Sequence, residues 1–218
     1  MRQRLWLLIG FSLLASSAIT VQAATVEQLI ETVKSIGPEG AGSEDAIQAV
    51  KELSRGSAEN MLPLLAAMQD ASPLAANWLR GAFESIAARE VKAGELPSQE
   101  LEAFVVDVQR EAHARRLAYE WILKVDPTIA DRLIPRMLQD PGADFRRDAV
   151  QRLIDEAVAL QAKEDKAAAI KTFRSALTGA TDDDQVQAIT KPLKELGESV
   201  NLQQHFGFVT TWRLVGTF

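Results

Sequence analysis

Apolar residues recur along this chain with the spacing of an amphipathic helix. Val26, Leu29, Ile30 and Val33 occupy positions i, i+3, i+4 and i+7, which predicts a first helix over about 25–36. The same periodicity predicts further helices around the apolar sets within 47–53, 61–68, 74–86, 101–122, 129–138, 149–158, 170–177 and 186–196. The chain is therefore expected to be helical almost throughout.

Polar and turn-forming residues separate these segments. Helix starts are expected at Ser43, at Ser72 followed by Pro73, at Ser98, at Asp126 followed by Pro127, and at Asp182 with Gln185 in capping-box spacing. No glycine or proline interrupts the apolar pattern between Leu101 and Ile122. That stretch predicts either one long helix or two helices that meet at a tight corner near His113.

Two parts of the chain repeat each other. The pair Arg115-Arg116 recurs as Arg146-Arg147, and the apolar pair Ile122-Leu123 recurs at the same offset as Leu153-Ile154. Met68-Gln69-Asp70 and Leu138-Gln139-Asp140 both end a predicted helix just before a turn. Such self-similarity is typical of stacked helical hairpins, each of which has an apolar face that it cannot bury alone.

This pattern resembles HEAT repeats, in which a helix ends in an Asp-containing turn and the second helix opens with a basic residue, a small residue and aliphatics. Residues 58–90 and 127–158 match best, and 99–125 match loosely. Residues 149–178 are similar to a tetratricopeptide hairpin, because Ala169, Phe173 and Ala176 have its second-helix spacing. The resemblance implies an all-α fold, a right-handed α-solenoid of about eight helices over 25–200.

The first 23 residues have the pattern of a secretory signal. Arg2 and Arg4 precede an apolar run from Leu5 to Ala15, and Val21-Gln22-Ala23 places small residues before a cut between Ala23 and Ala24. The apolar core is shorter than the roughly 20 residues that a membrane span needs, so a cleaved leader is favoured over an uncleaved anchor. The protein is expected to be periplasmic or secreted, with no stable membrane anchor after cleavage.

The C-terminal residues differ in composition from the helical part of the chain. Residues 206–218 are rich in aromatic and β-branched side chains, which predicts a β-strand tail. Trp212, Gly216 and Phe218 resemble the opening strand of galactose-binding-like β-sandwich domains. The domains are accordingly predicted as a signal peptide over 1–23, a helical repeat domain over 24–203 and the start of a truncated β domain over 204–218. The alternative is that the tail aromatics dock on the helices.

The amino-acid composition excludes several kinds of functional site. The chain has no cysteine, which excludes disulfides, thiolate metal sites and a cysteine nucleophile. With 24 Lys+Arg against 30 Asp+Glu its formal net charge is −6, and the only tight basic pairs are the two arginine pairs. A nucleic-acid surface needs clustered cations and usually a basic domain, so no nucleic-acid partner is expected.

No catalytic or metal constellation is recognisable. His113 is expected on the helix surface or at a corner, and His205 is expected to be structural. The run Asp182-Asp183-Asp184 invites a calcium interpretation, but its place before a helix favours capping. Gly37–Gly42 lacks the Lys and Ser/Thr of a phosphate loop. The chain is therefore predicted not to be an enzyme, with no cofactor and no metal.

The arginine pairs are the candidate partner-binding residues. Arg115, Arg116, Arg146 and Arg147 could line one edge of the stack and bind an anion or an acidic partner, or they could reach acids within the fold, such as Asp140 or Asp148. Trp78 and Trp121 fall on apolar faces and are expected in the core. The predicted function is a non-catalytic scaffold that binds a protein partner or companion domain. The alternative is the N-terminal segment of a secreted enzyme or carbohydrate-binding protein whose active domain lies beyond Phe218.

Overall fold

The computed structural model describes residues 24–207, 213 and 216, and within that part the protein is all-α. The described residues contain no strand. The α-helices are α1 (Val26–Lys34), α2 (Ser43–Leu53), α3 (Met61–Ala67), α4 (Pro73–Ala93), α5 (Ser98–Val106), α6 (Ala112–Leu123), α7 (Ile129–Leu133), α8 (Ala143–Ala162), α9 (Lys166–Gly179), α10 (Asp183–Glu195) and α11 (Leu202–His205). Four short 3-10 turns add Pro38–Gly40, Ala58–Asn60, Met68–Asp70 and Ile134–Arg136.

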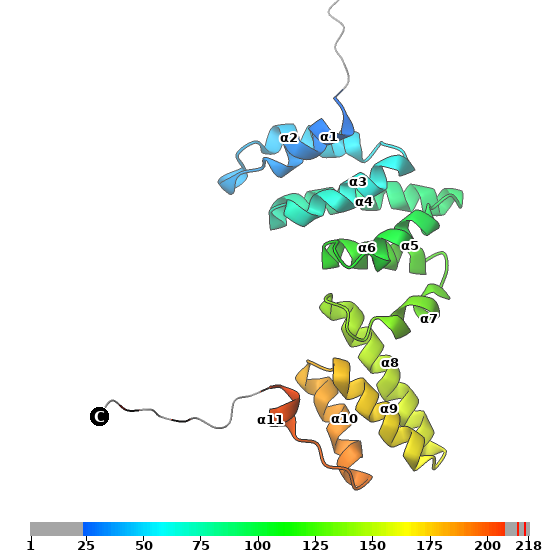
Figure 1. The fold of residues 1–218 in the computed structure, drawn as a ribbon. Helices are drawn as coiled ribbons and strands as arrows, with labels where there is room; N and C mark the ends of the chain where they lie inside the picture. The colour runs from blue at the N-terminus through cyan, green and yellow to red at the C-terminus, as the bar shows by residue number, and fades with distance from the viewer. Residues whose placement is uncertain (1–23, 208–212, 214–215, 217–218) are drawn as a thin grey trace, which may run out of the picture.

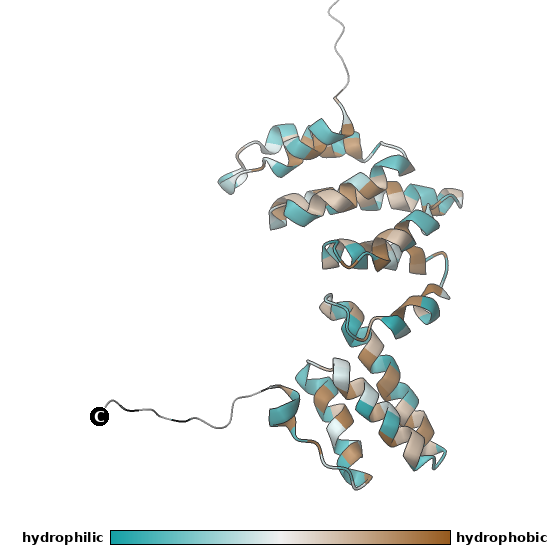
Figure 2. Ribbon diagram, in the orientation of Figure 1, coloured by the Kyte–Doolittle hydropathy of each residue, from teal (hydrophilic) through white to brown (hydrophobic). Residues whose placement is uncertain are grey.

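Consecutive helices pack in pairs that follow one another down the molecule. Figure 1 shows α1 with α2, α3 with α4 and α5 with α6 as successive tiers, followed by α7 and then by α8 packed on α9 and α10. In the hydropathy colouring of Figure 2, brown and teal segments alternate along the helices. This architecture is consistent with a helical-repeat type of fold.

The apolar interior consists of two clusters. The first extends from Ile30 in α1 to Ala149 in α8, and the second from Val150 in α8 to Leu193 in α10. Within α8, Phe145 and Ala149 belong to the first cluster, whereas Val150 and the residues after it belong to the second. One helix therefore joins two cores, as its length allows each end to be buried by different neighbours.

Some predicted helix starts are confirmed. The Ser72 hydroxyl accepts a hydrogen bond from the backbone N–H of Ala75 at 3.2 Å, and Pro73 is the first residue of α4. The segment after Leu101 forms two helices, α5 and α6, that meet at a corner over 107–111. The Asp107 carboxylate holds this corner by accepting bonds from the Gln109 N–H and the Arg110 guanidinium.

Other predicted starts are wrong by a few residues. Gly42, with φ of 77°, takes the capping position before α2, and Ser43 is already helical. Pro97 precedes α5, so Ser98 is its first residue rather than its cap. After Asp126 the first helical residue is Ile129, because the Asp126 carboxylate closes a turn onto the N–H of Thr128.

Most of the predictions for the two ends of the chain cannot be compared with the structure. The predicted leader over 1–23, with Ala23 of its cleavage site, lies outside the described residues, and so does most of the predicted strand. At its start the strand prediction is wrong, because His205 ends α11 and Phe206 is the C-cap of that helix. The predicted domain boundary between 203 and 204 falls inside α11.

Candidate functional site

The first arginine pair lies in α6 and binds acids of the next repeat. Arg115 is fully buried, and its two terminal nitrogens donate to both carboxylate oxygens of Asp140 at 2.9 and 2.7 Å. Its Nε donates to the carbonyl of Val105 at 2.7 Å, and its guanidinium lies over the Phe145 ring. Each side-chain nitrogen of Arg115 and both carboxylate oxygens of Asp140 have a hydrogen-bond partner inside the fold, so Arg115 is not available to contact a partner.

Arg116 lies closer to solvent and bridges two helices. It donates to Asp148 in α8 at 2.5 Å and to Glu120 on its own helix at 3.0 Å. Burial disfavours its charged form, but the hydrogen bonds to Asp148 and Glu120 outweigh that effect and raise the pKa of Arg116. The expectation that arginines at this position reach Asp140 and Asp148 is therefore confirmed.

The second arginine pair continues the same arrangement toward α10. Arg147 binds Asp182 at 2.8 Å and Asp184 at 2.5 Å, and the hydrogen bonds that it donates to Asp184 and Asp182 raise its pKa. Arg146 is half-buried and donates to the backbone carbonyl of Asp140 at 2.8 Å. We call the bonds of Arg115, Arg116 and Arg147 to acids of the following repeat the arginine ladder.

The ladder also explains the acidic run before α10. Asp182 occupies the capping position, but its side chain makes no capping hydrogen bond and accepts from Arg147 instead. Gln185, the expected partner in a capping box, donates to the carbonyl of Arg147 at 3.0 Å. The capping prediction is thus wrong in its detail. No group of three or more His, Cys, Asp or Glu able to hold a metal ion occurs among the described residues.

The surface position expected for His113 is confirmed, whereas the core position expected for Trp78 and Trp121 is met only in part. His113 is exposed at the start of α6 and its Nδ1 lies 2.6 Å from Glu111. His205 approaches the carbonyl of Ala180 at 3.3 Å. Trp78 and Trp121 are partly buried against the first core, and the Lys124 ammonium lies over the Trp121 ring.

A groove that sequence reasoning missed follows the starts of the second helices. One hollow of about 480 Å³ lies between α4 and α6, and a second of about 220 Å³ continues toward α8. Both are lined by Arg80, His113 and Leu117, so we treat them as one feature, the second-helix groove. Its lining residues come from helices far apart in sequence, so no local sequence motif predicts this groove.

The groove is lined by both charged and apolar residues. Pro73, Ala76 and Leu117 contribute apolar surface. Arg80 is bound to Glu84 at 2.9 Å, and Arg116 is held by the ladder. The side chain of Asp144, in the first turn of α8, has no hydrogen-bond or ion-pair partner among the described residues.

Glu111 lies on the wall beside His113 and also caps α6. Its carboxylate accepts a hydrogen bond from the N–H of Ala114 at 2.6 Å. Burial disfavours the charged carboxylate, but the hydrogen bonds from His113 and Ala114 outweigh this and lower the pKa of Glu111. The acid is therefore expected to be ionised at neutral pH and to contribute negative charge to the groove.

The described residues contain no helix that combines the length and apolar character needed to cross a membrane. Their buried side-chain nitrogen and oxygen atoms all have hydrogen-bond partners.

Comparisons with known proteins find no matching family model, no similar curated protein and no similar solved structure.

Proposed function

We propose that this protein is a non-catalytic scaffold of an exported, periplasmic or secreted system, built as a right-handed α-solenoid of HEAT-like hairpins that binds a protein partner. The observation that carries the proposal is the second-helix groove, whose apolar and charged lining residues come from α4, α6 and α8. Concave sites of mostly apolar surface with a few polar groups are the usual form of binding sites.

The charges of the groove indicate the partner's chemistry. Arg80 and Arg116 are each bound to acids of this chain, whereas Asp144 is not. Glu111 and Glu120 are also paired, with His113 and Arg116 respectively. Asp144 is therefore the charged lining residue without an ion-pair partner among the described residues, which favours an extended segment with an apolar side chain for the apolar part of the lining and a basic side chain for Asp144.

The arginine ladder prepares this groove for binding. Arg116 and Asp148 fix α6 against α8, and the buried Arg115–Asp140 pair fixes the turn before α8. Walls that are already ordered lose little conformational entropy when a partner binds. In this proposal the arginines act by positioning helices, and the partner contacts Asp144 and the apolar lining residues.

The test is site-specific photocrosslinking in cells that express the protein. A photoreactive residue at Asn77, exposed on the groove wall, is expected to give a discrete adduct, whereas one at Lys171, exposed on α9, is expected to give none. Asp144→Lys should remove the adduct, and Asp155→Lys on the same helix should leave it. Equal adducts at Asn77 and Lys171, or an adduct insensitive to Asp144→Lys, would contradict the proposal.

The export component has its own test. N-terminal sequencing of the protein from a periplasmic or secreted fraction is expected to begin at Ala24. Replacing Leu8 and Leu13 by Arg should retain the full-length chain in the cytoplasm, because charges interrupt the apolar core of the leader. Recovery of the intact N-terminus outside the cytoplasm would overturn this part of the proposal.

A further inference from the structure

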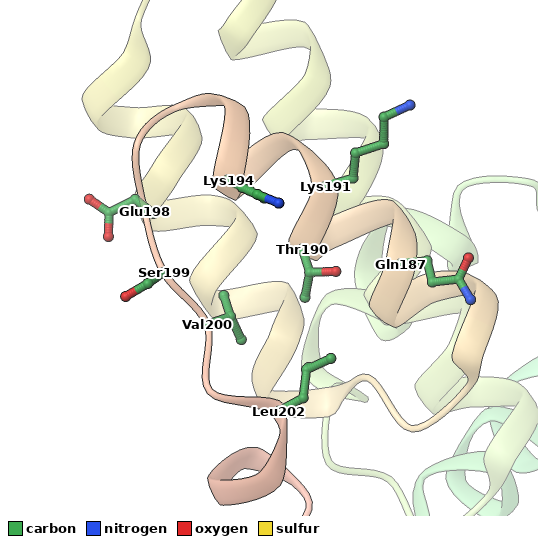
Figure 3. Close-up of a pocket in the computed structure, with 8 residues that line it drawn as sticks. All are labelled: Gln187, Thr190, Lys191, Lys194, Glu198, Ser199, Val200 and Leu202. Carbon is green, nitrogen blue, oxygen red and sulfur yellow. The ribbon is translucent and has the colours of Figure 1, made fainter.

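A second groove lies at the end of the molecule opposite to α1 and α2. It has a volume of about 510 Å³ and lies between one face of α10 and the segment 198–202 (Figure 3). Helix α10 contributes four residues at helical spacing, Gln187, Thr190, Lys191 and Lys194. We call this hollow the terminal groove. It shares no lining residue with the second-helix groove, so the two are separate surfaces.

The segment 198–202 gives the terminal groove its apolar surface. Val200 packs in part against the second core, and Leu202 is 39% exposed. Figure 3 shows both side chains on the side of the segment that faces Thr190. Covering the exposed part of these side chains with an apolar group removes apolar surface from water and is favourable. The groove can therefore accept an apolar side chain of a partner.

Two lysines without an ion-pair partner line the same groove. Lys191 and Lys194 are exposed and form no ion pair with any described residue. They are three residues apart on α10, so their side chains are neighbours on the helix surface. The acid among the lining residues, Glu198, is bound by Arg174. The lysines are therefore free to bind carboxylates from outside the chain.

Other acids of α10 do not cancel this charge. Glu195 follows Lys191 by one turn, but it forms no ion pair with that lysine and does not line the groove. Asp183 lies eight residues before Lys191, about 12 Å along the helix axis, and accepts a hydrogen bond from Gln187. Even with Glu195 counted, Lys191 and Lys194 leave an excess of positive charge. This end of the groove is positive in a chain whose formal net charge is −6.

We propose that the terminal groove binds an acidic segment of a partner protein, in which an apolar side chain lies beside carboxylates. The apolar side chain packs on Val200 and Leu202, and the carboxylates pair with Lys191 and Lys194. Anionic membranes are recognised by clusters of about four to eight Lys or Arg, more than this groove provides. The proposal does not rest on the second-helix groove, whose unpaired charge is an acid and which selects a segment of opposite charge.

The experiment is an NMR titration of the purified, isotope-labelled protein with a short synthetic peptide of leucine and glutamate. We expect shifts of the amide signals of Lys191, Lys194 and Leu202, with a Kd on the order of 1 mM because the contact is small. High salt should weaken this binding, because it screens the charges. The matched peptide with lysine in place of glutamate should leave these signals unchanged. Shifts that are absent, or equal for the two peptides, would overturn the proposal.

Variants separate the contributions of charge and apolar contact. K191E/K194E should weaken binding of the acidic peptide by at least about tenfold, because like charges then meet. Leu202→Ala should weaken it roughly threefold to tenfold through lost apolar contact. K163E/K171E reverses two exposed lysines that also lack an ion-pair partner, and this control should bind like the unmodified protein. Unchanged binding to K191E/K194E, or an equal loss in the control, would contradict the proposal; circular dichroism verifies that each variant keeps its helices.

Vesicles of phosphatidylglycerol provide the second probe. They are expected to leave the amide signals of Lys191 and Lys194 unchanged. Vesicles that shift these signals when the acidic peptide does not would assign the groove to a membrane surface instead. The photocrosslinking adduct at Asn77 reports on the other groove, so a failure of this titration is distinguishable from a failure of the proposed function.

Discussion

The two arginine pairs occupy the same place in two helices but meet different surroundings. Arg115 and Arg116 are the fourth and fifth residues of α6, and Arg146 and Arg147 have those positions in α8. Arg115 is buried against Asp140, whereas Arg146 is half-buried and binds only a backbone carbonyl and a hydroxyl. The same arginine pair at the same helix positions therefore yields a buried ion pair in one repeat and a partly solvated side chain in the next.

The difference traces to one residue in the following turn. Asp140 is the third residue before α8, and the third residue before α10 is Ala180. Ala180 has no carboxylate, so the guanidinium of Arg146 has no charged partner at the equivalent position. The comparison teaches that a repeated arginine becomes a core residue only where the next repeat supplies its acid.

The largest effect is expected from Arg115→Ala. This change leaves Asp140 as a buried, unpaired carboxylate and should lower the free energy of unfolding by about 3–5 kcal/mol. Arg146→Ala is the matched control and should cost about 1 kcal/mol, because only exchangeable hydrogen bonds are lost. Urea unfolding measures the change in the free energy of unfolding of both variants. Equal losses in the two variants would show that burial of Arg115 has no energetic consequence.

A smaller loss is expected where the two cores meet. Gly179, the last residue of α9, lies so close to Leu138 that an added Cβ would be 2.4 Å from its carbonyl oxygen. Gly179→Ala should therefore lower the free energy of unfolding by about 1–3 kcal/mol. Gly81→Ala in α4 meets open space and should raise it by up to about 1 kcal/mol. Thermal unfolding of both variants distinguishes close packing from helix propensity.

The missing acid can be restored to sharpen the comparison further. Ala180→Asp places a carboxylate at the position equivalent to Asp140, where it is expected to pair with Arg146. The substitution destabilises a buried site by itself, so the informative quantity is a double-mutant cycle with Arg146→Ala. We expect a favourable coupling of about 1 kcal/mol. A coupling of zero would mean that the turn before α10 cannot bring the two side chains together.

The smallest effect concerns the exposed pair of Arg147 and Asp184. The hydrogen bond from Arg147 lowers the pKa of Asp184 in the folded state. Its stabilising contribution is therefore fully present above the unfolded pKa of an aspartate, about 3.9, and is lost as pH falls through the lower folded value. Thermal midpoints of the native protein and Arg147→Gln should differ slightly at neutral pH and converge in acid. A difference that is constant across pH would exclude this linkage.

The all-α class and most helix positions followed from the sequence alone. Apolar periodicity identifies a helix wherever one face is buried, and Ser72 with Pro73 marks a start through bonds within a few residues. The sequence also indicated that the arginines could reach Asp140 or Asp148, but only the structure showed that Arg115 pairs with Asp140 and Arg116 with Asp148.

Only the tertiary structure decided how each repeated residue is used. Ser43, Ser98 and Asp182 have side chains suited to capping, yet backbone geometry or a distant arginine displaced them from that role. The division of α8 between two cores and the second-helix groove depend on residues far apart in the chain. Local patterns determine which residues can form a helix, whereas burial and charge pairing depend on neighbours that only the folded chain brings together.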